Sequence, residues 1–83
     1  MRHTPSLHDF TSLVRDVVGA TEIAPEAGFF EIGGDSLAAL ELSAAIETSW
    51  GVSIGIDVVM TAADLGDLHA DIVREVARLP DDT

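Results

Sequence analysis

The 83-residue chain is long enough for one small domain and too short for two independent hydrophobic cores. Hydrophobic residues make up 47% of it, a proportion that excludes an intrinsically disordered polypeptide. Acidic residues number 15 against 4 basic ones, all arginine, and the formal net charge is −11. This charge disfavours nucleic acid and anionic membrane surfaces as partners and favours a basic protein surface.

Cysteine and long apolar segments are both absent from the sequence. Without cysteine the chain has no disulfide scaffold, thiolate zinc site or Cys nucleophile, which is compatible with the reducing cytoplasm where we expect the protein. No apolar run approaches the roughly 18–20 residues of a membrane span, and no apolar signal core follows the first residues. So short a chain leaves little room for a self-contained active site, and we expect no enzyme activity.

The first periodic segment predicts an amphipathic helix over residues 6–18. Its apolar residues recur at spacings of three and four: Leu7, Phe10, Leu13, Val14, Val17 and Val18. Ser6 followed three residues later by Asp9 is typical of a capping box, and Gly19 is placed to end the helix.

Residues 20–35 predict a long connection because they contain one proline and three glycines. A loop of this length is uncommon unless it packs against the domain or carries function. Its apolar residues are expected to supply that packing, and both phenylalanines are interpreted as core anchors: Ile23, Phe29, Phe30 and Ile32.

The segment 36–50 predicts the helix of highest intrinsic propensity, since it is rich in Ala, Leu and Glu. Asp35 stands where a carboxylate accepts free backbone N–H groups, and Gly51 follows the helix end. Apolar residues surround the helix almost completely. We assign Leu42, Ile46 and Trp50 to the core and expect the other apolar face to be available to a partner.

Residues 52–59 alternate like a short strand, but a single strand would have no pairing partner in a helical chain. We therefore predict a loop that leads into a short helix around 57–60. Thr61 to Asp64 resembles a second capping signature, and a last helix is expected to end near Arg78. Its apolar stripe is Leu65, Leu68, Ile72, Val73 and Val76.

These elements predict an all-α fold, a small four-helix bundle of three long helices and one short helix with a long first loop. We expect a single domain over residues 1–83, with its core at about 6–78 and tails at 1–5 and 79–83. Pro80 and the residues after it are expected to fray.

The most informative feature is the run Gly33-Gly34-Asp35-Ser36-Leu37 at the junction of the loop and the second helix. Two glycines permit backbone conformations and close approaches that a side chain would obstruct. Ser36 stands at the first turn of a helix, where the free N–H groups favour a phosphate joined to its hydroxyl. This placement suits a serine that is modified better than one that attacks a substrate unaided.

A hydrolase is a poor alternative. The nucleophile elbow reads G-x-S-x-G after a strand, whereas Ala38 takes the last place here and no strand is predicted before it. None of the three histidines is spaced as a base for Ser36, and His3, His8 and His69 are interpreted as solvated surface residues. The acidic residues Asp64, Asp67 and Asp71 lack a calcium loop, so we expect a solvated face and no metal.

The segment Phe29–Glu47, FFEIGGDSLAALELSAAIE, resembles the core motif of the acyl and peptidyl carrier protein family. The likeness in helix order, first loop and apolar positions extends over roughly residues 6–78, and its specific part is Gly33 to Leu37. The double glycine before Asp35 is more similar to the peptidyl carriers of nonribosomal peptide synthesis than to the fatty-acid carriers.

The resemblance implies a phosphoprotein in which Ser36 receives a covalent 4′-phosphopantetheine arm from coenzyme A, added by a separate Mg²⁺-dependent transferase. It also implies that Gly34, Asp35 and Leu37 adjoin the cofactor. The thiol of the arm would hold the cargo as a thioester, so the cofactor brings the sulfur that the chain lacks. Further implied partners are an adenylating or acyl-loading enzyme and downstream condensation or tailoring enzymes, for example in antibiotic biosynthesis.

In the family the second helix docks onto biosynthetic enzymes. The corresponding positions in this chain are Leu37, Leu40, Glu41, Ala44 and Glu47. The two leucines would give hydrophobic contact, and the two glutamates would attract basic patches on partners. The alternative is that Leu40 belongs to the core and that the two glutamates only aid solubility.

We therefore expect a free-standing, monomeric peptidyl carrier protein that is not itself catalytic. Two alternatives stay open. One is a carrier for polyketide or fatty-acid intermediates, and the other, of a different class, is a helical adaptor that never carries phosphopantetheine.

Overall fold

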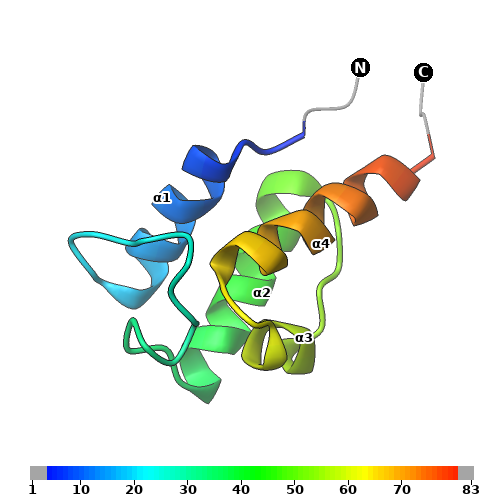
Figure 1. Ribbon diagram of the computed structural model, residues 1–83. Coiled ribbons are helices and arrows are strands. Elements are labelled where there is room, and N and C mark those ends of the chain that lie inside the picture. The colour runs from blue at the N-terminus through cyan, green and yellow to red at the C-terminus, as the bar shows by residue number, and fades with distance from the viewer. Residues whose placement is uncertain (1–3, 81–83) are drawn as a thin grey trace.

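The computed structural model describes residues 4–80, which form helices α1 (Leu7–Val18), α2 (Ser36–Trp50), α3 (Ile56–Thr61) and α4 (Leu65–Arg78) (Figure 1). There is no strand in this part of the chain. Helix α2 packs against α1 and α3, and α1 also packs against α4. The all-α prediction of three long helices and one short helix is confirmed, with the long connection between α1 and α2.

The ends of the two N-terminal helices lie where local chemistry places them. The Ser6 hydroxyl accepts a hydrogen bond from the Asp9 N–H at 3.0 Å, while the Asp9 carboxylate accepts one from the Ser6 N–H at 3.3 Å. This reciprocal pair is the predicted capping box. Gly19 and Gly51 end α1 and α2 with φ of 76° and 74°, a left-handed conformation that suits glycine.

The hydrophobic core draws on all four helices and on both long connections. Its buried members are Phe10, Val14, Phe29, Ala39, Leu42, Ile46, Val52, Ile54, Val59, Leu65, Leu68, Ile72 and Val76. Phe10 is fully buried, with its ring centroid 6.5 Å from that of Trp50 and 6.0 Å from that of His69. Most residues of the stripes predicted for the first and last helices therefore face one common core, but Leu7 is 37% exposed and Val73 is not part of the core.

Buried and exposed residues alternate along residues 52–55, although this segment is a loop and not a strand. Val52 and Ile54 are buried, while Ser53 and Gly55 are exposed. The Ser43 hydroxyl donates to the Ile54 carbonyl at 2.6 Å and so satisfies a backbone group that a neighbouring strand would otherwise bind. An extended loop of this kind has the same hydrophobic pattern as a strand.

Two sequence interpretations are corrected here. Thr61 does not cap α4, because it is the last residue of α3 and its hydroxyl donates to the Asp57 carbonyl at 2.7 Å. The cap is Asp64, whose carboxylate accepts from the Asp67 N–H at 2.8 Å. His69 is not a solvated surface residue: it is half-buried, with its Nε2 2.9 Å from the carbonyl oxygen of buried Pro5.

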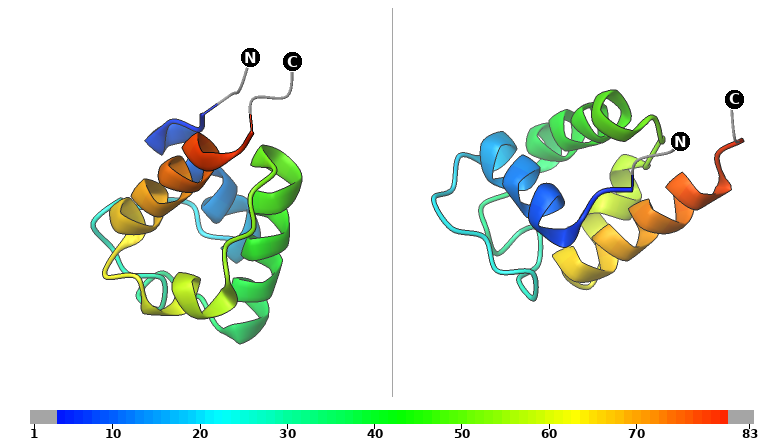
Figure 2. Two further views of the ribbon diagram at one scale, coloured as in Figure 1. Left: turned by 90° about the vertical axis from the view of Figure 1, so that its right-hand side faces the viewer. Right: turned by 90° about the horizontal axis from the view of Figure 1, so that it is seen from above.

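The expectations for His3 and for the tail residues 81–83 lie outside the described residues. The first and last described residues lie at one end of the molecule, and the N-terminus of α2 lies with α3 at the opposite end (Figure 1 and the left view of Figure 2). The start of α2 is therefore accessible from solvent at the end remote from both described termini.

Candidate functional site

The chain enters α2 through one helical turn that ends in a Schellman motif. The Gly34 N–H donates to the Phe29 carbonyl at 3.0 Å, and the Gly33 N–H donates to the Phe30 carbonyl at 3.2 Å. These are the outer and inner hydrogen bonds of that motif, and its C′ residue must adopt a left-handed conformation. Gly33 does so with φ of 91°. The first glycine of the pair is therefore required by the turn.

The second glycine is required by packing. Gly34 is buried, and a Cβ atom built on it would overlap three ring atoms of Phe29. Phe29 itself is 3% exposed and belongs to the core. Because its ring lies on the Gly34 backbone, the turn before α2 is fastened to the core at this point.

The two adjacent phenylalanines have different surroundings, which corrects the prediction that both anchor the core. Phe30 is 56% exposed, and its ring meets that of Phe29 edge-on with centroids 6.1 Å apart. Successive residues of a helical turn point in different directions, so only one of the two rings can lie against Gly34. The exposed ring belongs to the surface around the start of α2.

The long loop is also fastened to α4. The N–H groups of Leu65 and Gly66, the first two residues of α4, donate to the carbonyls of Ala27 and Pro25 at 3.0 and 2.9 Å. These helix-end donors have no partner within their own helix. The loop residues satisfy them, and in return α4 holds the loop in place.

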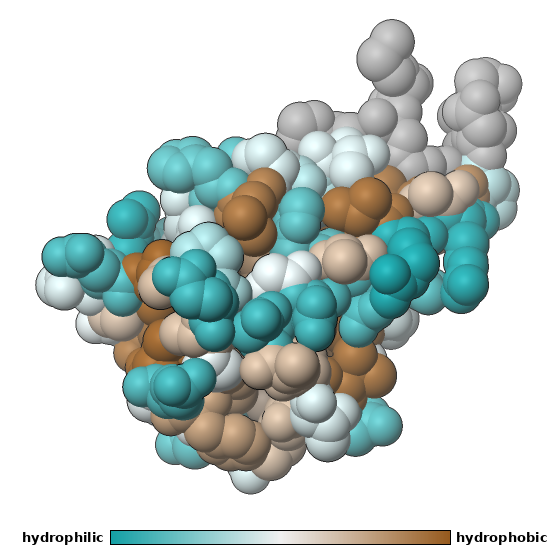
Figure 3. All heavy atoms as spheres, viewed as in Figure 1, coloured by the Kyte–Doolittle hydropathy of each residue, from teal (hydrophilic) through white to brown (hydrophobic). Residues whose placement is uncertain are grey.

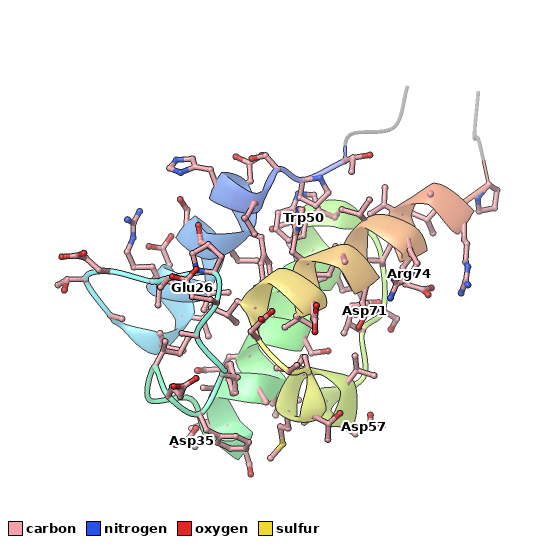
Figure 4. The ribbon with its side chains drawn as sticks, viewed as in Figure 1. Glu26, Asp35, Trp50, Asp57, Asp71 and Arg74 are labelled. Atoms are coloured by element: carbon pink, nitrogen blue, oxygen red, sulfur yellow. The ribbon has the colours of Figure 1, made fainter. Side chains whose placement is uncertain are left out.

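Asp35 and Ser36 occupy the junction itself. The Asp35 backbone is extended, and its carboxylate accepts a hydrogen bond from the Ala38 N–H at 2.9 Å, as predicted for an N-cap. Figure 4 places Asp35 at the end of the molecule where α2 begins. Ser36, the first helical residue, is exposed, and none of the described residues hydrogen-bonds its hydroxyl. No acidic residue lies in the first turn of α2, so the free N–H groups there favour an added anion.

Helix α2 has two apolar faces, as predicted. Ala39, Leu42 and Ile46 are fully buried, and Trp50 packs against the core while partly exposed. On the outer side Leu37 is 64% exposed and Leu40 52% exposed. The remaining positions carried over from the family motif are exposed as well: Glu41, Ala44 and Glu47.

Within the described range 4–80, the sequence around the start of α2 carries no basic residue. The sequence has no lysine or arginine between Arg15 and Arg74. Arg74 pairs with Asp71 and Arg78 with Glu75, all four on α4. Among the described residues, no ion pair is formed by Glu41 or Glu47 of α2, so a basic partner surface could neutralise them.

The described residues offer Ser36 no catalytic base or metal. Of the two described histidines, His8 is exposed on α1 and His69 contacts Pro5 near the far end of α2. No cluster of residues suited to a metal ion occurs within 4–80. No helix in the same range is both long and apolar enough to cross a membrane. The site therefore suits a covalent group on an exposed hydroxyl: the hydroxyl is accessible, has no hydrogen-bond partner and lies at a helix N-terminus.

Comparison with known sequences identifies the class of protein. Residues 8–72 match the family described as the phosphopantetheine attachment site, so the chain belongs to that family of carrier protein domains. It is 36% identical over 64 residues to the carboxylic acid reductase of Mycobacterium tuberculosis, covering 74% of this chain and 6% of that enzyme. It is 29% identical over 74 residues to the phosphinothricin tripeptide synthetase PhsB of Streptomyces viridochromogenes, covering 89% of this chain and 6% of the synthetase.

Solved structures have the same helical fold. The A-PCP didomain of carboxylic acid reductase from Segniliparus rugosus superposes with a TM-score of 0.77 at 32% identity, over 83% of this chain and 10% of the didomain chain. The 3,5-dioxohexyl acyl carrier protein of the actinorhodin polyketide synthase of Streptomyces coelicolor gives a TM-score of 0.79 at 27% identity, over 96% of this chain and all of that one. The protein is a carrier protein with a covalent 4′-phosphopantetheine cofactor.

Proposed function

We propose that Ser36 carries the phosphopantetheine arm and that the protein holds an aminoacyl or acyl intermediate and delivers it to biosynthetic enzymes. The observation that carries the proposal is the exposed Ser36 hydroxyl on the first residue of α2, which none of residues 4–80 hydrogen-bonds. When bound, the arm supplies a terminal thiol that holds the cargo as a thioester. The chain supplies the attachment point and the surface that partners recognise.

Loading of the arm is a phosphoryl transfer to this hydroxyl. The Ser36 oxygen forms a bond to the coenzyme A phosphorus that bears pantetheine, and the pyrophosphate P–O bond breaks. Adenosine 3′,5′-bisphosphate leaves, and the serine proton passes to a base of the transferase. The described residues offer Ser36 no base, which supports a separate Mg²⁺-dependent transferase as the source of the chemistry.

Three neighbouring residues position this hydroxyl. Gly34 allows the chain to pass over the Phe29 ring. Asp35 starts α2 by accepting the Ala38 N–H, which presents Ser36 at the surface. Leu37 is exposed beside it and offers apolar contact to the arm or to a partner enzyme. We assign these three residues positioning roles and propose that the chemistry is performed by partner enzymes.

We propose an aminoacyl or other carboxylic acid cargo activated by an adenylating enzyme, and condensation or tailoring enzymes as later partners. Relatives support this choice, since two of them are a tripeptide synthetase and a carboxylic acid reductase whose related didomain was solved with AMP. The likeness to polyketide acyl carrier proteins keeps the acyl alternative in place. Loading by an ATP-dependent adenylating enzyme, as opposed to a malonyl transferase, distinguishes the two cargo classes.

We also propose that residues 6–78 fold and function as one monomeric unit, because the core draws on all four helices. The absence of cysteine and the use of coenzyme A as donor support a cytoplasmic location.

The experiment incubates the protein with coenzyme A, Mg²⁺ and a broad-specificity phosphopantetheinyl transferase, followed by intact-mass measurement. Wild type is expected to gain one phosphopantetheine, and Ser36→Ala is expected to gain none. Ser49→Ala is a matched control, because Ser49 is an exposed serine at the other end of α2. Absence of any gain with both this transferase and a cognate one would leave the adaptor alternative.

A second prediction concerns the α2 surface. Glu41→Lys is expected to lower kcat/KM of a loading enzyme for the holo protein by about threefold to tenfold at low salt, because a charge at an interface rim acts mainly through the association rate. Glu26→Lys makes the same charge change on an exposed loop residue away from Asp35 (Figure 4) and is expected to have a smaller effect. Equal effects of the two variants would contradict a docking role for Glu41. Circular dichroism checks that both variants keep the helical fold.

A further inference from the structure

Phe30 is a large aromatic side chain that lies outside the buried core. It is 56% exposed, and its described ring contact is the edge-on contact with Phe29. Single exposed apolar residues are common, but a group of them at one place indicates a binding surface. Three of the five large hydrophobic residues exposed in the described chain flank Ser36 within eleven positions: Phe30, Leu37 and Leu40.

The backbone around Phe30 is held firmly. Its carbonyl accepts the Gly33 N–H within the Schellman motif, and the next glycine lies against the buried Phe29 ring. One turn earlier, the Gly28 N–H donates to the Glu31 carboxylate at 2.6 Å. The exposed ring is therefore presented on an ordered turn, which lowers the entropic cost of binding it.

The position of Phe30 relative to Ser36 selects the kind of partner. Enzymes that act on the thiol work at the far end of a long arm and need not cover the turn before α2. The transferase, by contrast, must bring its bound coenzyme A to the Ser36 oxygen itself, and so its surface must approach the residues on either side. Phe30 lies six positions before Ser36, in the turn that leads into α2.

We propose that Phe30 is an aromatic anchor for the phosphopantetheinyl transferase that loads Ser36. This inference rests on the proposed function. The partner surface would have an apolar recess for the ring and a rim of lysine or arginine. Asp35 and Glu41 make the surface around Ser36 acidic, and the chain has no lysine or arginine between Arg15 and Arg74. A basic rim on the transferase would complement this acidic surface. In Figure 3 hydrophobic and hydrophilic residues lie side by side at the end of the molecule where α2 begins.

The test is steady-state kinetics of the transferase with apo protein as the varied substrate. Phe30→Ala is expected to raise KM by about tenfold with kcat within about twofold of wild type, the loss typical of a buried aromatic anchor. Phe30→Leu is expected to restore most of the affinity. Leu7→Ala is the matched control, since Leu7 is also exposed but lies one turn from Phe10, whose ring contacts Trp50. Fourteen residues of helix, about 21 Å, separate Trp50 from Ser36.

The outcomes are distinct from those of the function test. If wild type is modified on Ser36 and Phe30→Ala has the KM of wild type, the anchor is disproved while the carrier function stands. If Phe30→Ala alters sedimentation by dissociating a dimer, the ring is covered by a second copy and the proposal is also overturned. Increased KM for Phe30→Ala, with unchanged helical content and an unaffected Leu7→Ala variant, supports the anchor.

Discussion

Gly34→Ala is expected to lower the free energy of unfolding by about 3 kcal/mol, because overpacking a rigid buried site costs about 1–3 kcal/mol. The added Cβ would overlap ring atoms of Phe29, which is itself enclosed in the core. Either the ring must leave its position or the turn before Ser36 must move. In both cases we expect slower modification of Ser36 as well as lower stability, measured by urea unfolding and by transferase kinetics at 10 °C.

Comparing Gly33→Ala with Gly34→Ala separates the cost of backbone strain from the cost of steric overlap. No atom lies within 4 Å of a Cβ at Gly33, but φ of 91° is unfavourable for alanine and costs about 1–2 kcal/mol. We therefore expect Gly33→Ala to be the milder variant. Adding Phe29→Ala to Gly34→Ala should recover stability relative to the sum of the two single changes, because the cavity accepts the new methyl group. Additive losses, or a Gly34→Ala variant as stable as wild type, would contradict the contact.

Local signals in the sequence were sufficient for most helix ends. Ser6 with Asp9, Gly19, Asp35 and Gly51 each act on backbone groups within five residues, and the structure has the predicted caps at all of these positions. The prediction that Thr61 begins the cap of α4 was wrong, because two side chains, those of Thr61 and Asp64, could compete for one helix start. Asp64 is adjacent to α4 and accepts the Asp67 N–H, whereas Thr61 bonds back into α3. A pattern of residue types cannot decide such competition.

Contacts between distant residues could not be predicted from the sequence. The Leu65 N–H meets the Ala27 carbonyl across thirty-eight positions, and His69 meets Pro5 across sixty-four. Backbone donors and acceptors are present at every residue, so composition carries no sign of these pairings. The same limit explains the half-buried position of His69, a residue type that is often exposed.

The difference between Phe29 and Phe30 could have been found in part. Adjacent residues seldom share one direction, so the sequence Phe-Phe already implied that one ring faces away from the core. The Schellman motif decides which ring this is. In that motif the Gly34 N–H donates to the Phe29 carbonyl, and Gly34 also lies against the Phe29 ring, so Phe30 is the ring that faces away. The family motif correctly located the junction of loop and helix, but the exposure of the aromatic residue six positions before Ser36 emerged from the structure.

The residues around the start of α2 thus have two different roles, one in packing and one in exposure to partners. Gly33, Gly34 and Phe29 hold the backbone against the core. Ser36 and Leu37, with Phe30, face solvent at the same end of the molecule. A rigid support under an exposed hydroxyl explains how a protein of 83 residues can present one serine reproducibly to a separate enzyme.

Phe10→Ala is expected to lower the free energy of unfolding by about 3–5 kcal/mol, the usual cost of truncating a fully buried phenylalanine. Phe10 is on α1, and its ring contacts Trp50 of α2 and His69 of α4, so its loss leaves a cavity between three helices. For a chain of this length the total stability is about 4–12 kcal/mol, at the usual 0.05–0.15 kcal/mol per residue. The variant should therefore be close to unfolding at 37 °C, as measured by circular dichroism during heating.

Phe30→Ala provides the matched control, since it is the same chemical change at an exposed position. We expect it to cost less than about 1 kcal/mol, because little core area is lost and one edge-on ring contact disappears. The two variants then have opposite profiles: Phe10→Ala loses stability, while Phe30→Ala keeps stability and loses transferase affinity. Similar melting temperatures for the two would mean that the burial of Phe10, and with it the packing of α1 against α2 and α4, is wrong.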